Sequence, residues 1–215
     1  IQHSASLGLR TLELGWVRSI NVTEKTCEAI RAQGVESNVA ISVHATYFFN
    51  LNATADEWPK SRKRLMDACH YGNLAGATDI IFHPGSYFQQ PAADVLKVAI
   101  PRLRDFVKEL RDAGNPVTLR PETMGKSAML GSFEDTLEMS AEIDGVQPCI
   151  DFAHLHARPG DGSVNTFVRQ NTDDFVVEYI YSRAGLFTIV ITITDSTGQT
   201  SRLQFVAPIF GDDVG

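Results

Sequence analysis

The chain has 215 residues, of which 43% are hydrophobic and 21% are charged, as in an ordinary globular protein of one or two domains. Its formal net charge of −7 argues against a broad basic surface for nucleic acid. Bound divalent cations could still supply positive charge at a local site. No apolar run approaches the roughly 18 residues of a membrane-spanning helix. Three cysteines without C-x-x-C spacing, at positions 27, 69 and 149, indicate buried free thiols in a reducing, cytoplasmic compartment.

Strand-like and helical segments alternate from Leu9 to about Asn165. The predicted strands are Leu9–Leu14, Val39–Ala45, Asp79–His83, Pro116–Pro121 and Val146–Phe152. The predicted helices are about Thr23–Gln33, Ala55–Ala75, Ala92–Ala113 and Ser132–Ile143. Sequences resembling capping boxes, T-A-D-E at Thr54 and S-F-E-D at Ser132, mark two helix starts, and glycines at 34, 76, 114 and 145 mark the ends. This alternation predicts an α/β fold with a parallel sheet and right-handed crossovers.

After Asn165 the pattern changes. Three β-branched and aromatic runs follow, at Phe175–Tyr181, Phe187–Thr194 and Arg202–Ala207, with turn-forming residues between them. Such runs predict a short antiparallel β meander. We therefore expect two domains, residues 1–165 and residues 166–215.

Several predicted strands end in a residue that can bind a metal. His44, His83, Glu122 and Asp151 each stand at or near the end of an apolar run, about one strand-plus-helix unit apart, and His154 follows closely. Because the C-terminal ends of parallel barrel strands converge on one mouth, these side chains are expected to meet. Imidazoles and carboxylates together predict a transition-metal site, with zinc as the first choice.

Four motifs resemble those of the endonuclease IV family of apurinic/apyrimidinic endonucleases, within the xylose-isomerase-like TIM barrels. They are H-A-T-Y-F-F-N-L from His44, F-H-P-G-S from Phe82, R-P-E-T-M-G-K around Glu122 and C-I-D-F-A-H from Cys149. The resemblance covers about residues 1–164. It implies hydrolysis of the phosphodiester on the 5′ side of an abasic site in DNA.

The resemblance also implies roles for individual residues. His44, His83 and Glu122 would hold one zinc, and Glu122, the predicted catalytic residue, would bridge to a second zinc that Asp151 also binds. His154 would belong to a third zinc. Tyr47 would contact DNA near the lesion, and we interpret His156 as substrate-facing.

The chain also departs from the family pattern of eight strand–helix units. Five predicted strands, with Ile1–Leu7 as the tail of a first helix, indicate a partial TIM barrel that lacks its first strand and its last two units. The later ligands of the family would then be absent, so we expect one or two Zn²⁺ ions rather than three, with Mn²⁺ or Mg²⁺ as alternatives. The open sheet edges favour a homo-oligomer. The C-terminal segment resembles part of a PKD-like or immunoglobulin-like β-sandwich, which suggests a chimera.

Other interpretations of these residues stay open. A single histidine in a strand is often a core residue, and a carboxylate at a strand end can simply cap the next helix. For the whole chain, one alternative to a nuclease is a sugar isomerase or epimerase on the same scaffold. The other is a folded, non-catalytic fusion product.

Overall fold

The computed structural model describes residues 1–158, 175–177, 185–194 and 200–209. The chain divides into two compact units, Ile1–Leu155 and His156–Gly215. The domain boundary expected near Asn165 lies outside the described residues and stays a prediction.

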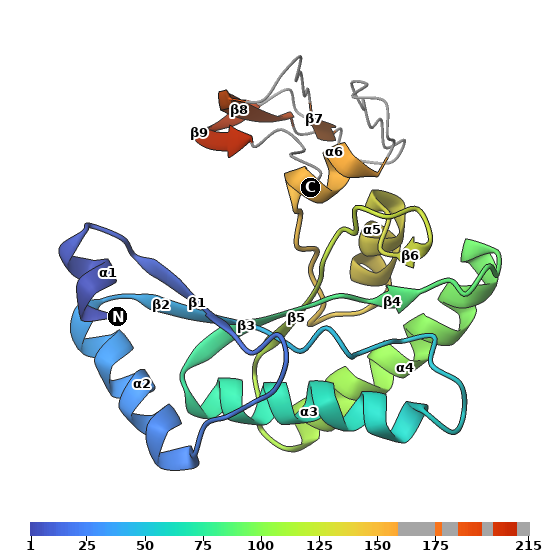
Figure 1. The fold of residues 1–215 in the computed structure, drawn as a ribbon, viewed down its shortest axis with the longest axis horizontal. Helices are drawn as coiled ribbons and strands as arrows, with labels where there is room; N and C mark the ends of the chain where they lie inside the picture. Colours follow the sequence, from blue (N-terminus) through green and yellow to red (C-terminus); the bar gives the residue numbers. More distant parts are fainter. Residues whose placement is uncertain (159–174, 178–184, 195–199, 210–215) are drawn as a thin grey trace, which may run out of the picture. The chain divides into compact units, whose positions relative to one another are not determined.

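The first unit is built on a four-stranded sheet in the order β1-β2-β3-β5 (Figure 1). All three neighbouring pairs are parallel, as the strand–helix alternation predicted. The strands are β1 (Thr11–Gly15), β2 (Ala40–His44), β3 (Ala77–Phe82) and β5 (Thr118–Pro121). The helices α2 (Glu24–Ser37), α3 (Trp58–Leu74) and α4 (Ala92–Asp112) cover one face of the sheet, and α1 (Gln2–Ser6) precedes β1 (Figure 1).

The two faces of the sheet differ in polarity because successive side chains of a strand point to opposite sides. Val43, Ile80 and Leu119 are fully buried in the core that includes residues of the helices. The opposite face carries an ion pair between Arg120 and Asp79, with Nε and Oδ1 2.6 Å apart. A hollow of about 440 Å³ lies over this polar face.

The fifth predicted strand, Val146–Phe152, is not a regular strand. Two isolated parallel bridges join this segment to β5, Leu119 to Val146 and Glu122 to Cys149. The N–H groups of Gln147 and Cys149 donate to the carbonyls of Leu119 and Pro121, but Pro121 of β5 has no N–H to donate back to Gln147. The segment nevertheless follows the edge of the sheet, and Phe152 already begins α6 (Phe152–Ala157).

Two predicted helix boundaries are wrong for local reasons. Gly34 lies inside α2, which ends at Asn38 in the left-handed conformation (φ 51°) that asparagine tolerates. Thr54 caps no helix with its side chain, because α3 begins only at Trp58, where Pro59 occupies the first turn.

The Ser132 capping box is confirmed. Ser132 Oγ accepts from the backbone N–H of Asp135, and an Asp135 carboxylate oxygen accepts from the backbone N–H of Ser132 at the start of α5 (Phe133–Glu142). The same Asp135 oxygen accepts from the N–H of Gly131 and from the Tyr87 hydroxyl. Asp135 therefore joins α5 to the β4–β6 ribbon (Gly85–Ser86 and Met129–Leu130), which the sequence patterns did not predict.

The second unit contains an antiparallel sheet of three described strands, β7 (Phe175–Val177), β8 (Gly185–Thr194) and β9 (Thr200–Ile209). The predicted meander therefore has the expected pairing where it is described, whereas residues 178–181 of the first predicted run lie outside. The resemblance to a PKD-like sandwich stays a prediction. No helix in the described ranges combines the length and apolarity needed to span a membrane.

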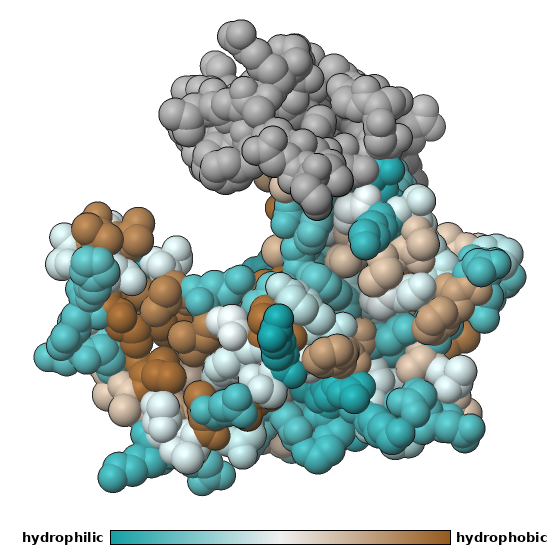
Figure 2. All heavy atoms as spheres, in the orientation of Figure 1, coloured by the Kyte–Doolittle hydropathy of each residue, from teal (hydrophilic) through white to brown (hydrophobic). Residues whose placement is uncertain are grey.

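Apolar side chains are exposed beside the free edge of β1. Figure 2 shows brown residues over α1 and the adjacent chain, where Leu7 is 64% and Leu9 52% exposed. Within the described sheet, β1 pairs only with β2, so its other edge carries unpaired backbone groups. The homo-oligomer predicted from open sheet edges stays a prediction.

We expect Asp135→Ala to lower the free energy of unfolding by about 3 kcal/mol, because a buried carboxylate that accepts several hydrogen bonds is lost. Urea unfolding followed by circular dichroism measures this change. Glu134→Ala is the control, since Glu134 is an exposed acid in the same helical turn. A loss no larger than that of Glu134→Ala would show that Asp135 does not hold the ribbon to α5.

Candidate metal centre

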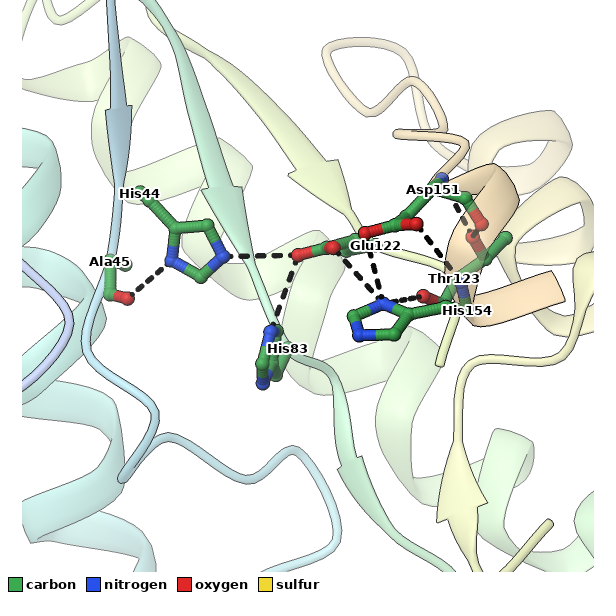
Figure 3. Close-up of polar contacts among 7 residues, drawn as sticks. All are labelled: His44, Ala45, His83, Glu122, Thr123, Asp151 and His154. Atoms are coloured by element: carbon green, nitrogen blue, oxygen red, sulfur yellow. Dashed lines mark hydrogen bonds and ion pairs between the residues drawn. The ribbon is translucent and has the colours of Figure 1, made fainter. Parts of the chain in front are cut away.

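Three of the predicted ligands form one group at the C-terminal ends of neighbouring strands. His44 is the last residue of β2, His83 directly follows β3, and Glu122 directly follows β5. Glu122 Oε2 is 3.0 Å from His44 Nε2 and 3.3 Å from His83 Nε2. Figure 3 shows both imidazoles pointing at this carboxylate oxygen. The parallel register therefore brings together side chains from three separate strand–helix units.

A second group uses the other oxygen of the same carboxylate. His154 Nδ1 lies 3.2 Å from Glu122 Oε1 and 3.3 Å from Asp151 Oδ2 (Figure 3). Both groups have their candidate ligand atoms within 4.8 Å of one another, so each could hold a metal ion. The structure thus places His154 with Glu122 and Asp151, whereas the resemblance assigned it to a third ion.

The two groups differ in how the histidine protons are arranged. His44 Nδ1 donates to the carbonyl of its neighbour Ala45 at 2.9 Å, which turns Nε2 toward Glu122, and Nε2 donates to Glu122 Oε2 at 3.0 Å. His154 Nδ1 instead donates to the carbonyl of Thr123 at 2.9 Å. An ion bound through His154 Nδ1 must therefore displace that proton. The backbone bond of His44 therefore uses the nitrogen that faces away from Glu122, whereas that of His154 uses the nitrogen that faces the carboxylates.

Glu122 is the electrostatic centre of both groups. The residue is only 6% exposed, and burial alone would raise the pKa of its carboxyl. Hydrogen bonds from His154, His44 and His83 outweigh burial and hold the pKa well below the usual value. Burial works against a charged His44, but its bonds to Glu122 and Ala45 raise the pKa of the imidazole overall. The bond to Glu122 is the main cause of the raised pKa of His154.

Thr123 orders the irregular segment that carries Asp151. Its hydroxyl donates to the Asp151 carbonyl at 3.2 Å and accepts from the Asp151 N–H at 2.9 Å. Its own N–H donates to the carbonyl of Cys149 at 3.0 Å. No sequence signal marked Thr123 as functional, since a threonine after a strand is common. This fully buried hydroxyl extends the pairing of Thr123 with Cys149 to the backbone of Asp151.

Asp151 has two roles in this structure. Its Oδ1 accepts from the backbone N–H of His154 at the start of α6, as the helix-capping interpretation proposed. Its Oδ2 faces His154 Nδ1. The capping contact therefore leaves one carboxylate oxygen for a ligand.

The predicted substrate residues lie in two places. The Tyr47 ring stacks on His83 with centroids 4.7 Å apart and meets the His44 ring edge-on at 5.4 Å, and Tyr47 is 50% exposed. Tyr47 therefore borders the first ligand group. The side chain of His156 lies outside the described residues, and its role stays a prediction. Cys149 is half-buried near Glu122, and burial raises the pKa of its thiol to about 12.

A parallel α/β sheet with imidazoles and carboxylates gathered at the C-terminal ends of its strands is the arrangement of the TIM-barrel class. The chain belongs to the xylose isomerase-like TIM barrel family, whose model matches residues 1–210.

Sequence comparison finds relatives of two descriptions. An uncharacterized protein of Methanocaldococcus jannaschii is 29% identical over 162 residues, which are 75% of this chain and 58% of that protein. Endonuclease 4 of Thermus thermophilus is 27% identical over 168 residues, with 73% of this chain and 58% of the relative covered. The chain therefore spans little more than half the length of these relatives.

Solved structures give the same picture of the fold. Endonuclease IV from Thermus thermophilus superposes with a TM-score of 0.56 at 28% identity, covering 72% of this chain and 57% of that chain. D-psicose 3-epimerase superposes with a TM-score of 0.59 at 12% identity, covering 72% and 57%. The second likeness concerns the fold alone.

We expect the metal-free protein to gain stability from this cluster within a defined pH window. The pKa of Glu122 is lowered, so its contribution is present above its usual value of 4.5 and lost as pH falls through the folded-state value. The pKa values of His44 and His154 are raised, so their contribution is complete below 6.5 and lost as pH rises through the folded-state values. The free energy of unfolding in EDTA should therefore fall between about pH 5.5 and pH 8.

The pH dependence should be much weaker in Glu122→Gln, which removes the shared negative charge. Urea unfolding of both proteins at the two pH values gives the double difference. The same slope in both proteins would mean that the imidazoles are not coupled to Glu122.

Proposed function

We propose that this chain holds the metal centre of an endonuclease IV-type phosphodiester hydrolase that acts on abasic-site DNA. The observation that carries the proposal is the arrangement around Glu122, whose two carboxylate oxygens face two different ligand groups. A carboxylate that bridges two neighbouring cations would have this arrangement. Two such ions can stabilise the attacking and leaving oxygens of a phosphoryl displacement.

The donor atoms suit zinc better than magnesium or calcium. Two imidazole nitrogens and a carboxylate oxygen make up the first group, and hard cations such as Mg²⁺ prefer all-oxygen sites. Mn²⁺ remains the runner-up. We propose one or two ions, with the first held by His44, His83 and Glu122. The second group, which includes Asp151 and His154, must first release the His154 Nδ1 proton.

A bound zinc ion would act as a Lewis acid toward the phosphodiester and its attacking water. The chain's own residues have other tasks. Glu122 would keep both groups in register, and Ala45 would orient His44 through its carbonyl. Tyr47, half-exposed and stacked on His83, would present an aromatic face to the nucleotide beside the reacting phosphate.

The assignment to DNA rests on similarity to relatives named endonuclease 4 and on the motifs that carry it. The sugar-epimerase alternative is supported by the xylose isomerase-like description of the family and by structures at 12–19% identity, whose likeness concerns the fold. The net charge of −7 also suits an enzyme that relies on bound cations, rather than on a basic surface, to meet phosphate.

We expect purified protein to contain about one to two zinc ions per chain by elemental analysis, and His44→Ala/His83→Ala to lose the first of them. His70→Ala is the control, because His70 is an exposed helical histidine that is in neither ligand group. The same zinc content in the double variant as in the wild type would place the metal elsewhere. No zinc in either protein, even after metal supplementation, would contradict the proposed centre.

We expect the zinc-loaded chain to nick a duplex with one abasic site, and His83→Ala to nick it about three orders of magnitude more slowly, since Lewis-acid stabilisation supplies several kcal/mol. A gel assay with an end-labelled duplex measures this, and an undamaged duplex tests specificity. His70→Ala should retain the wild-type rate. Zinc binding without nicking would favour the non-catalytic alternative, and nicking that persists in His83→Ala would indicate a contaminating nuclease.

A further inference from the structure

His83 lacks the hydrogen bond that orients the other two imidazoles of the centre. His44 Nδ1 donates to the Ala45 carbonyl, and His154 Nδ1 donates to the Thr123 carbonyl. Among the described residues, His83 has no such acceptor for its Nδ1 and makes its polar contact through Nε2, to Glu122. Its ring stacks instead on Tyr47, with centroids 4.7 Å apart and planes inclined by 23°.

The Tyr47–His83 stack joins two different loops, so its geometry depends on how those loops are held together. Tyr47 belongs to the loop after β2, and His83 begins the loop after β3. Four hydrogen bonds connect the loops just beyond the stack, and we call these bonds and their residues the loop zipper. Leu51 N–H donates to the Pro84 carbonyl (2.8 Å), Ser86 N–H donates to Asn50 Oδ1 (3.4 Å), and Asn52 Nδ2 donates to the carbonyls of Ser86 (3.1 Å) and Tyr87 (3.4 Å).

Asn50 is the central member of the loop zipper. Its Oδ1 also accepts from the N–H of Asn52 at 2.8 Å. The approach of the second loop is so close that a Cβ at Gly85 would lie 2.0 Å from this oxygen, and Gly85 has a φ of 127°. Only glycine fits there without displacing Asn50.

The zipper is anchored to the core of the unit on its other side. The buried Ser61 of α3 accepts from the N–H of Asn50 at 2.7 Å and donates to its carbonyl at 3.0 Å. Arg102 of α4 donates to the carbonyls of Leu51 and Ala53, at 2.6 and 2.8 Å. The loop after β2 is therefore fixed to two helices, and through it the loop that begins with His83 is fixed as well.

We propose that Asn50 is a positioning residue of the metal centre. Through the loop zipper it sets the separation of the two loops, holds Tyr47 against His83, and so aims His83 Nε2 at the first ligand group. This inference rests on the proposed metal centre. It differs from a purely structural role because it links a side chain that contacts no ligand to the coordination of the ion.

Cobalt(II) alone is the probe, since its visible absorption reports the geometry of its ligands. In Asn50→Ala we expect Co²⁺ affinity to fall about 10-fold to 100-fold, with a changed absorption spectrum, because support of a ligand is lost. Asn50→Asp should restore both, since every hydrogen bond of the Asn50 side chain is accepted by Oδ1. Asn115→Ala is the matched control, a buried asparagine before β5 that bonds to Cys69 and Val117, and should bind Co²⁺ as the wild type does.

Ser61→Ala covers the case in which Asn50→Ala does not fold, because alanine is favoured in a helix and only the two bonds to Asn50 are lost. We expect a smaller fall in Co²⁺ affinity with the same spectral change. Wild-type affinity and spectrum in the folded Asn50→Ala, or in Ser61→Ala if Asn50→Ala is unfolded, would overturn the inference while leaving the metal centre intact. Wild-type protein that binds no Co²⁺ would instead overturn the proposed centre itself.

Discussion

One buried carboxylate organises the functional end of this molecule. Glu122 is almost fully buried, and a carboxylate in such a place is costly unless its charge is balanced. Here three imidazoles from three different segments supply the balance, two at Oε2 and one at Oε1. All three histidine rings therefore contact one group, the carboxylate of Glu122, which directly follows β5. A change at Glu122 is felt in both ligand groups at once.

The parallel sheet brings these side chains together through the register of its strands. Glu122 follows β5 directly, and the registers of β2, β3 and β5 bring His44 and His83 to the same edge of the sheet. No long loop is needed, since every ligand of the first group lies at or one residue beyond its strand end. The second group lacks this advantage because its segment is not a regular strand. It relies instead on the Thr123 hydroxyl and on the short helix α6.

The sequence predicts those parts of the fold and site in which a local residue pattern is compatible with only one structure. Alternating apolar strands and helices imply a parallel sheet, and residues at successive strand ends must then meet. His44, His83 and Glu122 were therefore found without knowledge of any contact. Pro121 at the end of β5 could have indicated that its pairing with the fifth segment would be irregular, because a proline cannot donate to a ladder. The end of α2 at Asn38 and the absence of a Thr54 cap were not predictable in this way. Several neighbouring residues could end or cap each helix, and the tertiary fold selects among them.

Contacts between side chains and distant backbone had no sequence signal. Nothing in the sequence distinguishes Thr123 and Asn50 from other polar residues. Their roles follow from the hydrogen bonds that their side chains make in the structure. Both act on the ligands from outside the ligand set, Thr123 on Asp151 and, by our inference, Asn50 on His83. They act through different means, however, since Thr123 bonds to the backbone of the segment that carries Asp151 and Asn50 joins two loops.

The two ligand groups should consequently differ in their response to a metal. In the first, an ion would replace the proton between His44 Nε2 and Glu122, and the bond from Nδ1 to the Ala45 carbonyl could remain. In the second, the proton on His154 Nδ1 lies among three oxygens, and each of them favours its retention. A cation in the first group would withdraw charge from Glu122 and so weaken the hold of Oε1 on that proton. If the proposed centre binds two ions, the shared carboxylate would therefore favour occupation of the first group before the second.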